Sequence, residues 1–162
     1  AGVDSPTGIK VHPSGDTVVF GQSSASASHI RGVTLSTGTV NTLAGGDHGH
    51  EDAVGTNARF RNVGGIAFAE NGTAVYICDS GNHLIRKLVL ESLQVTTLVG
   101  TASSSGLTNG LNTGIQFDWP QVIAVSPDST RLYIGDKNNH VIRRVLIEYG
   151  YVLAETLSGS GT

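Results

Sequence analysis

A seven-residue segment that occurs twice, with a third degraded copy, limits the folds open to this chain more than any other feature. Asn82–Leu88 reads Asn-His-Leu-Ile-Arg-Lys-Leu, and Asn139–Val145 reads Asn-His-Val-Ile-Arg-Arg-Val. The degraded copy is Ser28–Val33, in which Ser28 stands in the place of the asparagine. Three copies at nearly even spacing indicate a repeat protein, in which each unit packs against its neighbours along the chain.

The repeat unit is close to 57 residues long, as the spacing of Phe60 and Phe117 illustrates. Three sets of apolar residues keep nearly the same spacing, and their small differences compensate one another. These sets are Ile9, Ile66 and Ile123; Ile30, Ile85 and Ile142; and Leu43, Leu98 and Leu157. The chain therefore holds a fixed structural unit with loops of adjustable length.

Each unit is predicted to form four short strands. In the second unit these are Gly65–Phe68, Ala74–Cys78, the motif segment ending at Leu90, and Val95–Val99. Val, Ile, Tyr and Phe dominate them, and turn residues separate them, as is typical of strands. In the first unit the turn before the motif is expected to be stretched to Gln22–Ser28. No helical periodicity extends over ten or more residues, so the fold class is all-β.

The spacing predicts a single domain, 1–162, made of units at about 6–44, 63–99 and 120–158. Glycine accounts for 22 of the 162 residues, which fits a chain with many tight turns. Two loops, 45–62 and 100–119, separate the units, and loops of this length are often functional. We expect Phe60 and Phe117, near the ends of these loops, to fill the gaps between units.

The units resemble the NHL repeat family, whose name is the tripeptide at Asn82–Leu84. The second unit matches best, and the third almost as well, through Tyr133–Asp136 and Asn139–Arg144. The first unit has Gly21-Gln22 where the others have an aspartate. The resemblance implies a β-propeller fragment of three four-stranded blades around a central channel.

A propeller of this family usually has about six blades, so the resemblance implies half of a six-bladed ring. Three blades alone would leave two apolar blade faces uncovered, which soluble monomers rarely tolerate. We expect either a homodimer that closes the ring about a two-fold axis or the missing blades of a longer chain. No stretch has the length of a membrane span.

The repeated polar residues are interpreted as a structural motif. Asp79 and Asp136 precede Arg86 and Arg143 by seven residues, a spacing that lets each pair meet across a tight hairpin. Recurrence once per blade favours a requirement of the fold over a chemical role. The same reasoning applies to the other members of the motif, which are Asn82, Asn139, His83 and His140.

The loop segment Asp47–Asp52 contains the candidate metal ligands His48, His50, Glu51 and Asp52. Imidazole and carboxylate groups suit zinc and other transition metals, but this spacing matches no established site. We therefore expect neither a metal nor a cofactor. Asp52–Gly55 and Asn109–Asn112 are interpreted as turn-forming connectors.

Three functions remain open, and binding of a protein partner through the propeller loops is favoured. The alternative of RNA binding would use a basic patch, but the net charge is −3. That patch would consist of Arg59, Arg61, Arg86, Lys87, Arg143 and Arg144. The other alternative is part of a metal-dependent lyase or lactonase. Against it, only His12 ends a first strand with a ligating side chain, and its counterparts are Ala69 and Ser126. Cys78, the single cysteine, is expected to be a buried apolar residue.

Overall fold

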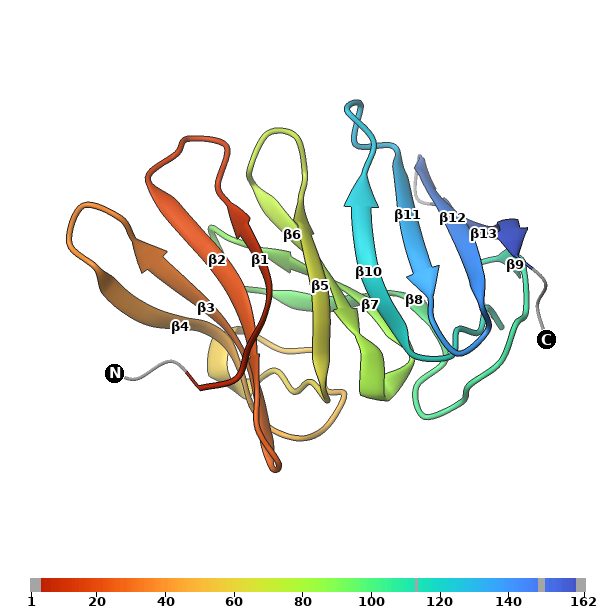
Figure 1. Ribbon diagram of the computed structural model, residues 1–162, viewed down its shortest axis with the longest axis horizontal. Coiled ribbons are helices and arrows are strands. Elements are labelled where there is room, and N and C mark those ends of the chain that lie inside the picture. Colours follow the sequence, from red (N-terminus) through yellow and green to blue (C-terminus); the bar gives the residue numbers. More distant parts are fainter. Residues whose placement is uncertain (1–3, 113, 149–150, 160–162) are drawn as a thin grey trace.

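The computed structural model describes residues 4–112, 114–148 and 151–159. It confirms the all-β prediction, because the chain forms three antiparallel sheets arranged as consecutive blades (Figure 1). The first blade contains β1 (Pro6–Val11), β2 (Thr17–Ser23), β3 (Ala27–Thr34) and β4 (Thr39–Asp47). The second contains β5 (Val63–Phe68), β6 (Ala74–Asp79), β7 (Leu84–Val89) and β8 (Val95–Gly100).

The third sheet has five strands rather than four. Its repeat strands are β10 (Pro120–Val125), β11 (Arg131–Asp136), β12 (Val141–Glu148) and β13 (Tyr151–Gly159). The fifth is the two-residue strand β9 (Gly110–Leu111), which pairs with the outer edge of β13. The added strand comes from the loop before this blade, which reaches the free edge of the outermost strand.

Two boundaries in the first blade differ from the prediction. The stretched turn predicted at Gln22–Ser28 is wrong, because β2 and β3 continue to pair as far as Ser23 and Ser28. Only residues 24–26 form the turn, which is closed by a backbone hydrogen bond from Ser24 N to Ala27 O. The loop predicted at 45–62 also begins later, because β4 extends to Asp47 along the lengthened β3.

The degraded copy of the motif is aligned differently from the prediction. Ile30 pairs with Ala44 on the outer strand, just as Ile85 pairs with Val99. This pairing places Ser28 at the position of His83, not at the position of the asparagine, and His29 at the position of Leu84. The similarity of the letters Ser-His-Ile and Asn-His-Leu suggested an alignment one residue out of register.

Each outer strand contains a β-bulge at the repeated leucine. Between the pairs Ile85–Val99 and Arg86–Thr97 the register shifts by one residue, which leaves Leu98 without a partner. The same shift occurs at Leu43 and Leu157. A bulge increases strand twist locally and re-aims side chains. Here it places a threonine opposite the motif arginine in every blade.

The first strands of the blades, β1, β5 and β10, lie next to one another along the inner side of the arc (Figure 1). Gly65 allows this close approach, because a Cβ there would lie 3.0 Å from the carbonyl oxygen of Gln121. Gly8 has the same role against β5, where a Cβ would lie 2.7 Å from Gly64 O. The inner strands are therefore packed backbone to backbone.

Two apolar clusters hold the blades together. Between the first and second blades the cluster includes Ile30, Ile66 and Phe60, and between the second and third it includes Ile85, Ile134 and Phe117. Both phenylalanines are fully buried. They lie at the blade junctions, as their even spacing predicts, and full burial of such a ring contributes about 1.5–3 kcal/mol.

Candidate functional site

The most extensive polar cluster surrounds Arg86 at the start of β7. Its guanidinium and the carboxylate of Asp79 are both fully buried, and Arg86 Nη1 donates to Asp79 Oδ2 at 2.8 Å. Asp79 also accepts from the side-chain amide of Asn82 at 2.9 Å and from the backbone N–H of Arg61 at 2.7 Å. The short 3-10 turn η2 (Ser80–Asn82) brings Asn82 back over the aspartate.

Arg86 also binds the connector that leads into its own blade. Nη2 donates to the carbonyl oxygen of Glu51 at 3.0 Å and to Asp52 Oδ1 at 2.7 Å. Nη1 donates to the carbonyl oxygen of Arg59 at 3.0 Å, and the guanidinium lies 5.2 Å from the ring centroid of Phe60. One buried cation thus holds both ends of the loop.

The third blade repeats this arrangement almost atom for atom. Arg143 donates to Asp136 at 3.1 Å and to the carbonyl oxygens of Gln116 and Thr108 at 2.9 and 3.0 Å. Asn109 takes the place of Asp52, at 2.9 Å from Arg143 Nη2. Phe117 lies under the guanidinium at 4.8 Å, and Asn139 donates to Asp136 as Asn82 does to Asp79.

In the described part of the chain, the first blade contains a version of the cluster without a carboxylate. Arg31 occupies the position of Arg86, and its Nη1 donates to Gln22 Oε1 at 3.3 Å. Gln22 stands where Asp79 and Asp136 stand in the other blades. Among the residues that the structure describes, this blade has no carboxylate within its arginine cluster.

Burial and hydrogen bonding act in opposite directions on the buried carboxylates. Burial raises the pKa of Asp79 above the usual range, while the donors from Arg61, Asn82 and Arg86 lower it. Burial likewise raises the pKa of Asp136. We favour the ionised form of both, because every polar group directed at these carboxylates is a donor.

The two motif histidines lie at equivalent turns but in different surroundings. Both have left-handed backbone conformations, with φ of 62° at His83 and 56° at His140. His83 Nδ1 accepts from the backbone N–H of Trp119 at 3.2 Å and lies 3.5 Å from Asp118 Oδ1. His140 is exposed, because no following blade covers it within the described residues.

The candidate metal ligands do not converge. Asp52 accepts from Arg86 and from the backbone N–H of Thr97, so its oxygens are already engaged. His50 and Glu51 are exposed, whereas His48 Nε2 is buried without a hydrogen-bond partner. Across residues 4–112, 114–148 and 151–159, no three His, Cys, Asp or Glu side chains gather as a metal ion would require.

The residues named for the two alternative functions are also scattered. Arg86 and Arg143 are fully buried, so they cannot belong to a basic surface that contacts RNA. Arg144 pairs with Glu155 on the adjacent strand. His12 packs edge-on against Phe68 and contacts the carbonyl oxygen of Gly72 in the second blade at 3.1 Å. Cys78 is fully buried, and burial raises its pKa, which suppresses the reactive thiolate.

Sequence reasoning missed the connector half of the cluster. Asp52 and Asn109 were interpreted as turn residues, yet they are side-chain acceptors for the buried arginines. The signal was present, since Asp52 and Asn109 are 57 residues apart, as are Gly49 and Gly106, whose carbonyl oxygens accept from Asn82 and Asn139. The contacts of Asp52 and Asn109 with arginines 34 positions later could not be predicted from the local sequence pattern.

Both helical segments of the described chain, η1 (Gly55–Asn57) and η2, are single 3-10 turns. Neither approaches the length and apolar character of a helix that crosses a membrane.

Comparison with known proteins identifies the repeat. No protein-family model matches the chain. It is 29% identical over 156 residues to NHL repeat-containing protein 2 of Bos taurus, which covers 91% of this chain and 22% of that protein. It is 32% identical over 154 residues to Protein SUPPRESSOR OF QUENCHING 1, chloroplastic, of Arabidopsis thaliana, which covers 90% of this chain and 14% of that protein.

A solved structure shares the fold. The crystal structure of an auxiliary nutrient binding protein from Bacteroides ovatus matches with a TM-score of 0.71 and 26% identity, over 91% of this chain and 37% of that one. The chain spans only about a fifth of the length of the bovine relative. With its repeated motif, its blade architecture and relatives named for the same repeat, the chain belongs to the NHL repeat family.

Proposed function

We propose that this chain is a non-catalytic interaction scaffold whose end blade binds protein. The observation that carries the proposal is the uncovered outer face of the third blade. Val122, Ile142 and Leu157 are exposed there by 59%, 44% and 45%. Ile85, which corresponds to Ile142 in the second blade, has no exposed surface, because the third blade covers it. An apolar blade face of this kind is suited to another blade.

Another blade could come from a second copy of this chain or from further repeats of a longer chain. Two copies would supply six blades, and closed rings related by a two-fold axis are the commonest form of small assembly. We therefore propose a homodimer that closes a six-bladed ring. In a longer chain, additional repeats would cover the same face.

The connectors give such a scaffold rigid loops. Arg86 fixes the loop between the first and second blades through Glu51 O, Asp52 and Arg59 O. The exposed side chains of Asp47, His50 and Glu51 are consequently presented on a well-supported backbone. Rigid, variable loops at the rim of a propeller are a suitable surface for a protein partner.

Light scattering after size exclusion tests the proposed association. We expect the mass of two chains at micromolar concentration. Ile142→Asp should weaken dimerisation by at least about tenfold, since burying an unpaired carboxylate costs more than 1.4 kcal/mol. Val54→Asp is the matched control, because Val54 is 50% exposed in the connector beside Gln94 of the second blade, away from both open blade faces. A wild-type monomer at these concentrations would contradict the proposed homodimer.

A further inference from the structure

We propose that the cavity on the open face of the third blade binds the segment Asp4–Pro6 of a second copy of this chain. The inference rests on the proposed association and adds which residues meet and in which orientation. The two copies join head to tail, with the third blade of each against the first blade of the other. The argument starts from the junction between the second and third blades.

At that internal junction, the segment Asp118–Pro120 enters the third blade across the end of the second. Trp119 N donates to His83 Nδ1 at 3.2 Å, and Asp118 Oδ1 lies 3.5 Å from the same nitrogen. Ser80 Oγ donates to the carbonyl oxygen of Pro120 at 2.5 Å. A histidine, a donor side chain and an incoming acidic segment thus define the contact.

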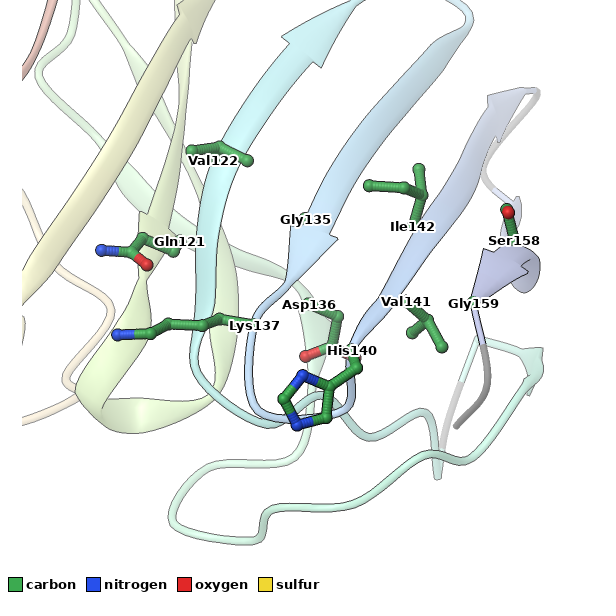
Figure 2. A pocket seen from close by; sticks show the side chains of 10 residues that line it. All are labelled: Gln121, Val122, Gly135, Asp136, Lys137, His140, Val141, Ile142, Ser158 and Gly159. Carbon is green, nitrogen blue, oxygen red and sulfur yellow. The ribbon is translucent and has the colours of Figure 1, made fainter. Parts of the chain in front are cut away.

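The third blade presents the residues at the equivalent positions around an open cavity. The cavity, of about 480 Å³, is lined by His140, Lys137, Val122, Ile142 and neighbouring residues (Figure 2). His140 corresponds to His83, and Lys137 corresponds to Ser80. Lys137 retains a donor for a carbonyl oxygen and adds a positive charge. The cavity is therefore complementary to a segment that carries a carboxylate and a free backbone N–H.

This chain contains a segment of that kind at the entry to its first blade. Asp4–Pro6 leads into β1 as Asp118–Pro120 leads into β10, and both read Asp-x-Pro. Ser5 has the left-handed conformation of Trp119, with φ of 42° against 58°. All three residues of the segment are exposed. The backbone shape and the charge both match the open cavity.

The residues at the junctions vary together. Where the second blade offers His83, the incoming residue is Asp118, and where the first blade offers Ser28, it is Arg61. Ser28 Oγ accepts from Asn62 N at 3.1 Å, so the backbone contact is the same at both junctions. His140 occupies the position of His83, and Asp4 occupies the position of Asp118 at the proposed junction.

The junction between copies is wider near the inner strands than the internal junctions. At the position of Gly65, where a Cβ would lie 3.0 Å from the next strand, the third blade has Val122. Its side chain must separate the two inner strands. We therefore expect reversible association rather than the permanent packing found within the chain.

Cross-linking between Asp4→Cys and His140→Cys tests the orientation. The two single variants are mixed and treated with a short bis-maleimide reagent, and the one native thiol, Cys78, is buried. Head-to-tail contact predicts a covalent dimer in the mixture and none in either variant alone. The control mixture pairs His140→Cys with Asp128→Cys, which lies in the turn at the opposite ends of the strands.

A charge swap provides the second measurement. Asp4→Lys should weaken dimerisation about tenfold, because each of two identical junctions loses the partly exposed ion pair between Asp4 and Lys137. Combining it with Lys137→Asp returns an opposite-charge pair to each junction and should restore part of the loss, because the second change also removes the donor to the carbonyl oxygen of Pro6. A dimer by light scattering that shows neither the cross-link nor this rescue overturns the inference but leaves the proposed association intact. A monomer overturns both, and leaves the cavity to the next blade of a longer chain.

Discussion

The first and second blades place an arginine at the same point of the third strand and surround it differently. Arg31 and Arg86 both pair with a threonine across the bulged outer strand. Arg86 binds a buried aspartate and both ends of a connector, whereas Arg31 donates to the neutral side chain of Gln22. Strand pairing therefore fixes the position of the arginine in both blades. Among the described residues of these two blades, only the blade with a buried aspartate also has hydrogen bonds between its arginine and the connector.

The largest effect should come from removing the carboxylate in the second blade. Asp79→Ala leaves the Arg86 charge fully buried without its partner, and such losses cost about 3–5 kcal/mol. The matched change in the first blade, Gln22→Ala, removes one neutral acceptor and should cost about 1 kcal/mol. Urea unfolding followed by circular dichroism measures both. Equal losses would mean that the two clusters do not differ in their energetics.

Replacing the connector acceptors should give a smaller difference in the loss of stability between the second and third blades. Asp52→Ala removes acceptors from Arg86 and Thr97, and we expect a loss of about 2 kcal/mol. Asn109→Ala removes a neutral acceptor from Arg143 and should cost about 1 kcal/mol. Thermal unfolding compares the two variants. A larger loss for Asn109→Ala would show that charge is not what distinguishes these connectors.

Replacing the two motif histidines should give a still smaller difference in the loss of stability. His83→Ala removes the acceptor for Trp119 N, with an expected loss of about 1 kcal/mol. His140→Ala should change the stability of the monomer by less than about 0.5 kcal/mol, as for other exposed positions. Measurements at concentrations below dimerisation separate this effect from association. A clear loss for His140→Ala there would reveal an internal contact of that side chain.

The smallest effect concerns pH and the position where the first blade has His29 in place of Leu84. Burial lowers the pKa of His29, with the charge of Arg31 acting in the same direction. The unfolded chain therefore takes up the proton more readily, so stability is full above the ordinary histidine pKa of about 6.5 and falls as pH drops below it. His29→Leu should reduce this loss between pH 7.5 and 5.5. An unchanged pH profile in urea unfolding would contradict the assignment to His29.

The blade architecture was predictable because the sequence repeats its strand and turn chemistry at a nearly constant interval. The seven-residue spacing of Asp79 and Arg86 was enough to predict that they meet, since both lie next to one hairpin turn. Local pattern could not predict contacts such as Asp52 with Arg86, which depend on how a whole connector folds back over the blade.

The misalignment of Ser28 has a different cause. The β-bulge and the strand pairing assign Ser28 to the position of His83, whereas the order of letters favours the asparagine. Register in a sheet is set by the pattern of apolar side chains and by turn geometry, so the match of two polar letters is a weaker guide to it. The spacing of Ile30 and Ile85 already gives the observed register, because the same offset aligns Ser28 with His83 and Arg31 with Arg86.

The arginine clusters also determine the order in which a growing chain can become structured on the ribosome. Every side chain and carbonyl group bound by Arg86 precedes it in the sequence, from Glu51 to Asp79. The partners of Arg143 likewise precede it, from Thr108 to Asp136. When each arginine leaves the exit tunnel, all of its partners have already been synthesised. The side-chain hydrogen bonds of these two arginines therefore require no later residue, which suits synthesis from the N-terminus, one repeat after another.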